Sequence, residues 1–174
     1  MARVDRSVCA QVYVGLGSNL DDPISQVRAG IALLATLRAT QVDICSSLYR
    51  TAPVGMTAQP DFINALCRLQ TQLDPAEIMA GLLALESERG RVRDVSGGPR
   101  TLDLDLLLYF SSQGHMVQCQ GPDLTLPHPR LHERAFVLYP LQEITPGLAI
   151  PGRGRVEDLL ANCGGQSIEK WVAT

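Results

Sequence analysis

Residues 98–109 set two aspartates in a run of leucines and constrain the fold more than any other part of the chain. Successive side chains of a β-strand point to opposite faces. Asp103 and Asp105 are therefore expected on one face, and the leucines at positions 102, 104 and 106 on the other. So apolar a run is typical of a strand inside a sheet rather than at its edge. We predict a central strand with a carboxylate pair on one side and the hydrophobic core on the other.

Two carboxylates side by side repel each other, and a divalent cation between them would remove that repulsion. Oxygen ligands a few ångströms apart suit Mg²⁺, which commonly takes one or two protein carboxylates together with substrate phosphates. The same pattern also occurs on strand faces that are simply solvated. This segment alone leaves both interpretations open.

Arginines cluster directly before the carboxylate pair. Arg89, Arg91, Arg93 and Arg100 lie close together, offset only by Asp94. Guanidinium groups bind phosphate in a bidentate manner, and phosphoryl transfer depends chiefly on positioning and charge stabilisation. Adjoining cations and carboxylates therefore favour a Mg²⁺–nucleotide site, although a cluster of arginines is often only a solvated surface.

Size and charge limit the possible classes. The 174 residues predict a single domain, residues 1–174. Fifteen Lys+Arg against eighteen Asp+Glu give a net charge of −3, so no nucleic-acid partner is expected. No apolar run approaches the ~20 residues of a membrane span, and the N-terminal residues lack the apolar stretch of a signal peptide. We expect a cytoplasmic monomer with no membrane partner.

The five cysteines are odd in number and widely spaced, with no C-x-x-C pair. This argues against a disulfide framework and against a zinc site. Cys45 and Cys67 lie in apolar, strand-like runs and are predicted to be small core residues. A reducing cytoplasm is consistent with such usage.

Hydrophobic periodicity predicts an α+β fold with a mostly antiparallel sheet, because strands and helices intermix without strict alternation. Strands are expected over 11–16, 41–49, 62–73 and the aspartate segment, and a hairpin over 111–126. Helices are expected over 23–37, from 74 to about 89, within 133–144 and over 156–162. The second of these is expected to begin with a capping box, formed by Asp74 and Glu77. Residues 50–60 and 91–98 are expected to be loops.

Residues 15–20 read GLGSNL, but Leu20 replaces the third glycine of the dinucleotide fingerprint. There is no Walker sequence, and Lys170 is the only lysine, so any phosphate contact is expected to come mainly from arginine. We predict a strand-to-helix turn here. Farther along, His128 lies between two prolines, where it is either a donor to phosphate or part of a structural hydrogen bond.

Taken together, these motifs resemble the 6-hydroxymethyl-7,8-dihydropterin pyrophosphokinase family of folate biosynthesis, from about residue 12 to residue 146. The resemblance rests on Glu86, on Gly90-Arg91 and on five ordered segments: GLGSNL at 15–20, SLYRTAP at 47–53, QPDFIN at 59–64, GPRTLDLD at 98–105 and LPHPRLHERAF at 126–136. It implies a ferredoxin-like αβα sandwich with helices on both faces of the sheet. It also implies transfer of a diphosphate from ATP to the hydroxymethyl group of the reduced pterin, with release of AMP.

The resemblance also implies roles for individual residues. Two Mg²⁺ ions would be held by Asp103 and Asp105. The catalytic residues would be Arg91, Arg100 and Asp105. The nucleotide would be bound by Glu86, Arg93, His128 and Arg134. The pterin would be bound by Thr51, Pro53, Val54, Gly55, Phe62, Asn64 and Phe136.

Two alternatives remain open. A non-catalytic relative would bind a pterin or a nucleotide without turnover, and its support is the stretch 94–98, which lacks the tryptophan that many family members carry. A general nucleotidyl or sugar-nucleotide transferase would use the same D-x-D pair without a pterin.

Overall fold

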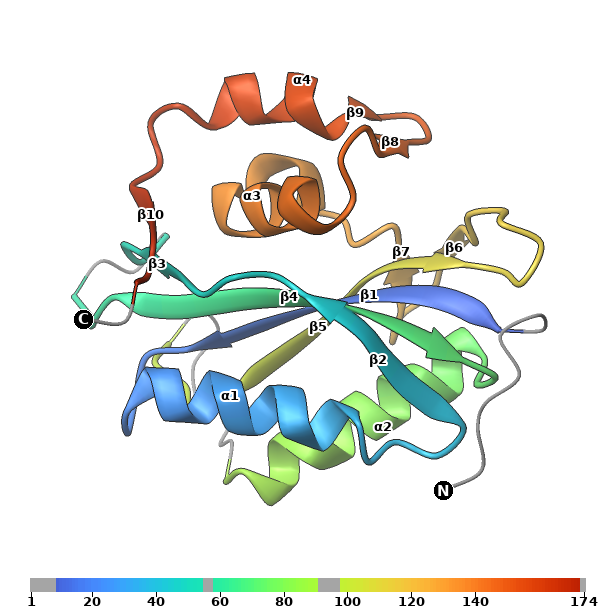
Figure 1. Ribbon diagram of the computed structural model, residues 1–174, viewed down its shortest axis with the longest axis horizontal. Helices are drawn as coiled ribbons and strands as arrows, with labels where there is room; N and C mark the ends of the chain where they lie inside the picture. The colour runs from blue at the N-terminus through green and yellow to red at the C-terminus, as the bar shows by residue number, and fades with distance from the viewer. Residues whose placement is uncertain (1–8, 55–57, 91–97, 173–174) are drawn as a thin grey trace.

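A computed structural model describes residues 9–54, 58–90 and 98–172 of the chain (Figure 1). Its centre is an antiparallel sheet in the order β10-β3-β4-β1-β5, and β2 also pairs with β4. The strands of this sheet are β1 (Ala10–Ser18), β2 (Thr40–Cys45), β3 (Tyr49–Thr51), β4 (Phe62–Thr71), β5 (Asp103–Phe110) and β10 (Ile168–Lys170). The α+β class and the mostly antiparallel sheet predicted from the sequence are confirmed.

Helices cover both faces of this sheet, as predicted. α1 (Pro23–Leu34) and α2 (Pro75–Glu88) lie on one face, and α3 (Ala135–Ile144) and α4 (Val156–Leu160) lie on the other (Figure 1). The smaller elements are β6 (Cys119–Gln120), β7 (Thr125–Leu126), β8 (Ala149–Ile150), β9 (Gly154–Arg155), η2 (Leu131–Glu133) and η3 (Ala161–Cys163).

The predicted capping box begins α2. The Glu77 N–H donates to Asp74 Oδ1 at 2.8 Å, and the Asp74 N–H donates to Glu77 Oε2 at 3.0 Å. Both bonds satisfy backbone donors that have no partner within the helix, which stabilises such a helix by roughly 1 kcal/mol. The helix therefore starts where the sequence predicts.

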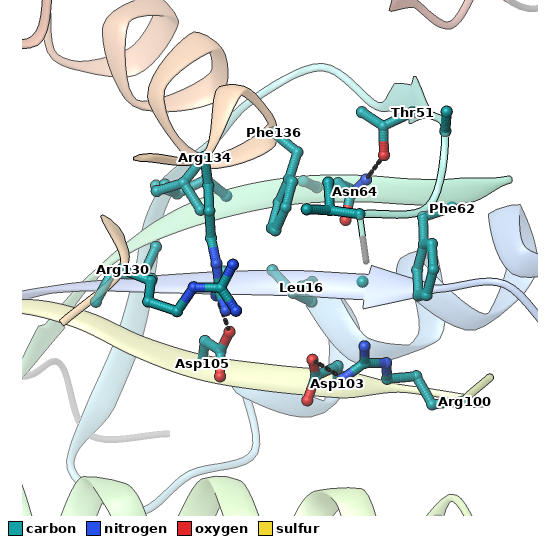
Figure 2. A pocket seen from close by; sticks show the side chains of 18 of the residues that line it. Leu16, Thr51, Phe62, Asn64, Arg100, Asp103, Asp105, Arg130, Arg134 and Phe136 are labelled. Carbon is teal, nitrogen blue, oxygen red and sulfur yellow. Dashed lines mark hydrogen bonds and ion pairs between the residues drawn. The ribbon is translucent and has the colours of Figure 1, made fainter. Parts of the chain in front are cut away.

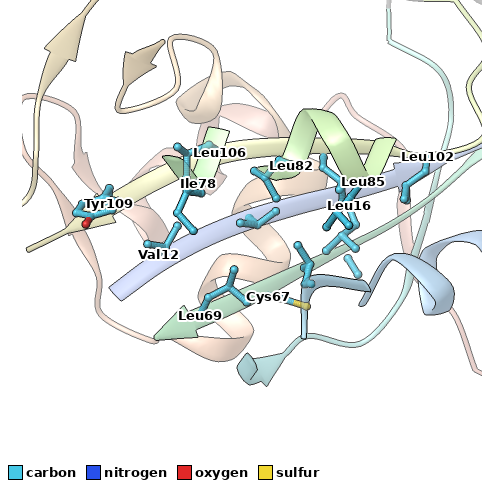
Figure 3. Close-up of a cluster of buried hydrophobic side chains, with 14 of the residues drawn as sticks. Val12, Leu16, Cys67, Leu69, Ile78, Leu82, Leu85, Leu102, Leu106 and Tyr109 are labelled. Carbon is cyan, nitrogen blue, oxygen red and sulfur yellow. The ribbon is translucent and has the colours of Figure 1, made fainter. Parts of the chain in front are cut away.

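Side-chain alternation divides the apolar residues between two cores. Val12, Val14 and Leu16 of β1 pack with Leu104 and Leu106 of β5 against α1 and α2 (Figure 3). A second cluster, which includes Tyr13, Leu107 and Leu138, lies under α3 and α4. The leucines at 102, 104 and 106 are 0–3% exposed, so the predicted core face of the aspartate strand is confirmed.

The strand predicted over 41–49 is in fact two strands. β2 pairs with the second half of β4, whereas β3 pairs with its first half. The strand is therefore interrupted between Cys45 and Tyr49. Ser46 bridges the break, because its N–H donates to the Leu66 carbonyl at 2.8 Å and its hydroxyl accepts from the Leu66 N–H at 3.0 Å. Thr51, predicted to lie in a loop, is the last residue of β3.

The cysteine prediction was wrong at one pair. Cys45 and Cys67 face each other across β2 and β4 with their Cα atoms 4.2 Å apart, and they form a disulfide. Cys9, Cys119 and Cys163 take no part in a disulfide. Spacing along the chain could not reveal this pair, because only the strand register brings the two residues together.

We expect alkylation of the air-oxidised, denatured protein to label three of its five cysteines, because two are joined in the disulfide. Mass spectrometry after labelling checks this. Prior treatment with a phosphine reductant should raise the count to five. Five labelled cysteines without reductant would contradict the pairing.

Candidate functional site

A cavity of about 260 Å³ opens on the α3 side of the sheet (Figure 2). Its walls come from five parts of the chain: the end of β1, the start of β4, the start of β5, the end of β3 with the residues after it, and the start of α3. Nine of the residues with a predicted role line it: Thr51, Val54, Phe62, Asn64, Arg100, Asp103, Asp105, Arg134 and Phe136. The fold thus brings together residues from motifs far apart in the sequence.

The two carboxylates of β5 each contact an arginine. Arg100 Nη1 lies 2.8 Å from Asp103 Oδ2, and Arg134 Nη1 lies 3.3 Å from Asp105 Oδ2 (Figure 2). Arg100 comes from the segment before β5, whereas Arg134 comes from the residue before α3. Two guanidinium groups from different segments of the chain therefore offset the repulsion between the neighbouring carboxylates.

Each of these arginines also lies over a phenylalanine. The Arg100 guanidinium is 5.3 Å from the centre of the Phe62 ring, and that of Arg134 is 5.5 Å from the centre of the Phe136 ring. Both distances suit a cation–π contact. The rings project into the cavity from opposite sides, Phe62 from the start of β4 and Phe136 from α3 (Figure 2). A flat heterocycle between two such rings would lie beside both arginine–carboxylate pairs.

Asn64 supplies a polar group between the rings. Its side-chain amide donates to Thr51 Oγ1 at 2.8 Å, and both residues are buried (Figure 2). This hydrogen bond fixes the orientation of the amide, because the oxygen must then point away from Thr51. A fixed amide between two aromatic rings is suited to recognise the edge of a planar ligand.

The glycines of the GLGSNL motif form the floor of the cavity. Gly17 pairs with Asn64 on β4 and with Asp103 on β5, and Gly15 pairs in the same way with Leu66 and Asp105. A Cβ atom on Gly17 would lie 3.0 Å from Asn64 Oδ1. The predicted turn begins only beyond Ser18, since both glycines lie inside β1. They leave open the space between the amide on one side and the carboxylates on the other.

The Asp103/Asp105 pair fits the predicted metal chemistry. In the part of the chain that the structure describes, no three His, Cys, Asp or Glu side chains gather into a metal-binding group. Two carboxylates facing one cavity suit a cation that takes its remaining ligands from water and substrate phosphates, as Mg²⁺ does, better than a closed site of protein ligands.

Known proteins with similar sequences share this set of motifs. A family model described as "7,8-dihydro-6-hydroxymethylpterin-pyrophosphokinase (HPPK)" matches residues 13–146. The chain belongs to this family. A 2-amino-4-hydroxy-6-hydroxymethyldihydropteridine pyrophosphokinase of Pseudomonas aeruginosa is 41% identical over 160 residues, which cover 92% of this chain and 96% of the relative.

Two further relatives carry the same name. The protein from Haemophilus influenzae is 39% identical and covers 85% of this chain and 89% of its own length. The protein from Bacillus subtilis is 42% identical over 132 residues, or 76% of each chain. These names support the predicted pyrophosphokinase rather than the non-catalytic alternative.

A solved structure of an HPPK-DHPS protein in complex with substrates has the same fold. It matches with a TM-score of 0.67 and 10% identity, over 88% of this chain and 43% of that one. At this identity the likeness concerns the fold, and it agrees with the predicted α+β sandwich.

Within this pyrophosphokinase fold, Asn19 does not line the cavity but joins two segments that do, a role that the sequence did not reveal. Its side-chain oxygen accepts from the Arg100 N–H at 2.9 Å, and its own N–H donates to the Arg100 carbonyl at 3.1 Å. Its amide nitrogen also donates to Gln59 Oε1 and to the Pro60 carbonyl. Asn19 thereby ties the segment before Phe62 to the backbone of Arg100. Only its place in the GLGSNL motif could have drawn attention to it.

Other predicted residues lie elsewhere. Pro53 lines a second cavity next to the first, and Glu86 is buried with its carboxylate accepting from the Leu104 N–H at 2.7 Å. Gly55, Arg91 and Arg93 fall outside the described residues. Arg130 and Gln59 line the main cavity, although the sequence did not single them out as site residues.

His128 is anchored beside the carboxylate strand. Its N–H donates to the Leu107 carbonyl at 2.9 Å, and its Nδ1 accepts from the Arg130 N–H at 3.2 Å. Burial lowers the pKa of His128 to about 4, and nearby Arg134 contributes to the shift. The ring is therefore neutral near pH 7, and since Nδ1 accepts, the proton is on Nε2.

We expect the His128 ring to titrate near pH 4 in the ligand-free protein, well below its usual 6.5. NMR of the imidazole C–H protons during a pH titration checks this. Between these two values the unfolded chain binds more protons than the folded one, so the free energy of unfolding should fall as the pH is lowered through this window. His128→Gln should reduce that dependence. A midpoint near 6.5 would contradict the expectation.

Proposed function

We propose that the protein binds ATP and 6-hydroxymethyl-7,8-dihydropterin in this cavity, transfers a diphosphate from ATP to the hydroxymethyl group of the pterin, and releases AMP. The observation that carries the proposal is that a pocket with two phenylalanine rings and a fixed amide shares one cavity with two arginine–carboxylate pairs. The aromatic pocket with its amide suits a planar acceptor, and the arginine–carboxylate pairs suit the charged phosphates of a donor. Such a shared cavity would hold both reactants close to the position in which they react.

On the acceptor side, Phe62 and Phe136 would stack on the two faces of the pterin, and Asn64 would bind its polar edge. Support comes from the projection of both rings into the cavity and from the Asn64–Thr51 hydrogen bond. Thr51, Pro53, Val54 and Gly55 would complete the pocket from the segment that follows β3.

On the donor side, Asp103 and Asp105 would hold two Mg²⁺ ions together with the ATP phosphates. When bound, Mg²⁺ supplies neutralisation of the phosphate charge and lowers the pKa of a coordinated hydroxyl. Arg100 and Arg134 already lie against these carboxylates, so their guanidinium groups would meet phosphate oxygens at the same place.

The remaining donor contacts would come from three further residues. The His128 Nε2–H would donate to a phosphate oxygen. Arg91 would act with Arg100 on charge that develops during transfer, and Arg93 would contribute to nucleotide binding. Arginine suits such positions because it stays charged and binds phosphate through two donors at once. Glu86, which is buried and accepts from the Leu104 N–H, would contribute by holding the start of β5 in place.

We further propose a single-domain monomer that acts in the cytoplasm. Among the described residues, no helix has the length and apolar character needed to cross a membrane. In a reducing cytoplasm Cys45 and Cys67 would be present mainly as thiols, held opposite each other by the β2–β4 pairing.

Asp105→Asn should lower kcat for AMP formation from ATP, Mg²⁺ and the dihydropterin by at least about a hundredfold, because it removes a charged metal ligand while preserving size. A coupled assay for AMP measures this. Asp43→Asn is the matched control, since Asp43 also pairs with an arginine, Arg68 at 2.7 Å, but does not line the cavity. Full activity of Asp105→Asn, or dihydropterin binding by the parent without AMP formation, would refute the proposal.

Gly17→Ala should weaken dihydropterin binding by about tenfold while the protein stays folded, because the new methyl group would press on Asn64 Oδ1. Isothermal titration calorimetry with the dihydropterin measures the change. Gly164→Ala is the control, since a Cβ atom there meets nothing within 4 Å. Equal affinity of the Gly17 variant and the parent would remove Asn64 from the acceptor site.

A further inference from the structure

A side chain from near the C-terminus holds the start of α3. Gln166 Oε1 accepts from the Ala135 N–H at 2.9 Å, and Gln166 Nε2 donates to the Glu133 carbonyl at 2.7 Å. These two backbone groups flank Arg134, whose backbone is extended, with φ −114° and ψ 109°. One amide side chain thus fixes the peptide groups on both sides of the arginine.

This contact replaces a missing helix cap. The N-cap residue of α3 is Arg134, and its side chain makes no capping hydrogen bond within the described part of the chain. Ala135 is only 1% exposed, so its N–H is poorly placed to bond water instead. An unpaired buried N–H is costly, and Gln166 supplies the acceptor that the local sequence lacks.

The residues fixed in this way are the ones that reach the cavity. Arg134 contacts Asp105, and Phe136, one residue into the helix beyond Ala135, projects its ring into the cavity (Figure 2). A small shift of the start of α3 would therefore move both side chains together.

The same C-terminal segment also holds the opposite wall. We call residues 166–171 the C-terminal strap; it runs from the α4 layer to the sheet edge beside β3 (Figure 1). Within it, β10 pairs with β3 so that Ile168 lies opposite Thr51, and the Trp171 N–H donates to the Leu48 carbonyl at 2.8 Å.

An ion pair links the strap to the two walls as well. Lys170 Nζ lies 3.0 Å from Glu143 on α3, and this carboxylate also accepts from the hydroxyl groups of Tyr49 and Ser47, each at 2.7 Å. Burial opposes ionisation, but these hydrogen bonds together lower the pKa of Glu143, so the carboxylate is charged near pH 7.

There is space behind the wall that Gln166 supports. A second cavity, about 290 Å³, lies between residues 51–54, the start of α3 and residues 165–167, and Phe136 lines both cavities. Side-chain packing alone therefore does not hold this ring in place from behind. The two Gln166 hydrogen bonds restrict it through the backbone.

We propose that Gln166 is a positioning residue for the acceptor site: it sets Phe136 and Arg134 at the productive distance from the carboxylate strand. The inference rests on the proposed function, and it concerns a residue beyond the 13–146 region matched by the family model. Gln166 itself does not line the main cavity, so it acts through the start of α3.

Gln166→Ala tests the inference by calorimetry with 6-hydroxymethyl-7,8-dihydropterin, in the presence of Mg²⁺ and a non-hydrolysable ATP analogue. Loss of both hydrogen bonds should raise the Kd for the dihydropterin by about fivefold to tenfold. Gln166→Glu keeps the acceptor for the Ala135 N–H but sets a carboxylate oxygen against the Glu133 carbonyl oxygen, so its Kd should also rise. Glu169→Gln is the control, because Glu169 is an exposed strap residue paired only loosely with Arg50 at 3.6 Å.

Two readouts separate positioning from a general structural role. Trp171, the only tryptophan, lies in the strap, so unchanged fluorescence in Gln166→Ala would show that the strap stays docked. In a Phe136→Leu background, Gln166→Ala should cause little further loss of affinity, because both changes act on the same ring.

The outcomes distinguish this inference from the proposed function. A parent protein that binds no dihydropterin would overturn both. A parent that binds it, with Gln166→Ala binding equally well, would overturn only the role of Gln166. Fully additive losses in the Phe136→Leu background, or a changed Trp171 spectrum, would also overturn it, since the residue would then act by another route. If Gln166→Ala fails to fold, Gln166→Glu provides the same comparisons.

Discussion

The pairing of two neighbouring carboxylates with two arginines is the interaction on which the arrangement of this site depends. Asp103 and Asp105 share one face of β5, and their mutual repulsion would disfavour the folded strand without cations nearby. Arg100 reaches them from the approach to β5, and Arg134 from the start of α3. Because each arginine also lies over a phenylalanine of the acceptor pocket, the charged part and the aromatic part of the cavity are held together as one unit.

The sheet sets the distance between these parts. β1 lies between the strand that carries Asn64 and the strand that carries the carboxylates, so the two are separated by two strand spacings, about 10 Å. Glycines at positions 15 and 17 keep that interval free of side chains. The other face of β1 carries large apolar residues, so the strand forms the floor of the site and still contributes to the core beneath it.

Much of this was predictable from the sequence, and the failures have physical causes. Period-two alternation located the aspartate face, and the capping box located the start of α2, because both are local patterns. The disulfide, the cavity-floor role of the glycines and the Asn19 and Gln166 contacts were missed. Each depends on strand register or on contacts between distant segments, such as Cys45 with Cys67 or Gln166 with Ala135. The roles assigned to Arg91, Arg93 and Gly55 remain predictions.

The Cys45–Cys67 disulfide has a topological consequence. It closes a covalent ring over a sequence separation of 22 residues, and this ring contains Thr51, Phe62 and Asn64. When the bond is formed, a protease that cuts once inside the ring leaves a single covalent molecule, whereas the reduced chain would separate into two fragments on denaturation. The acceptor side of the cavity can thus be nicked without losing its attachment to either half of the protein.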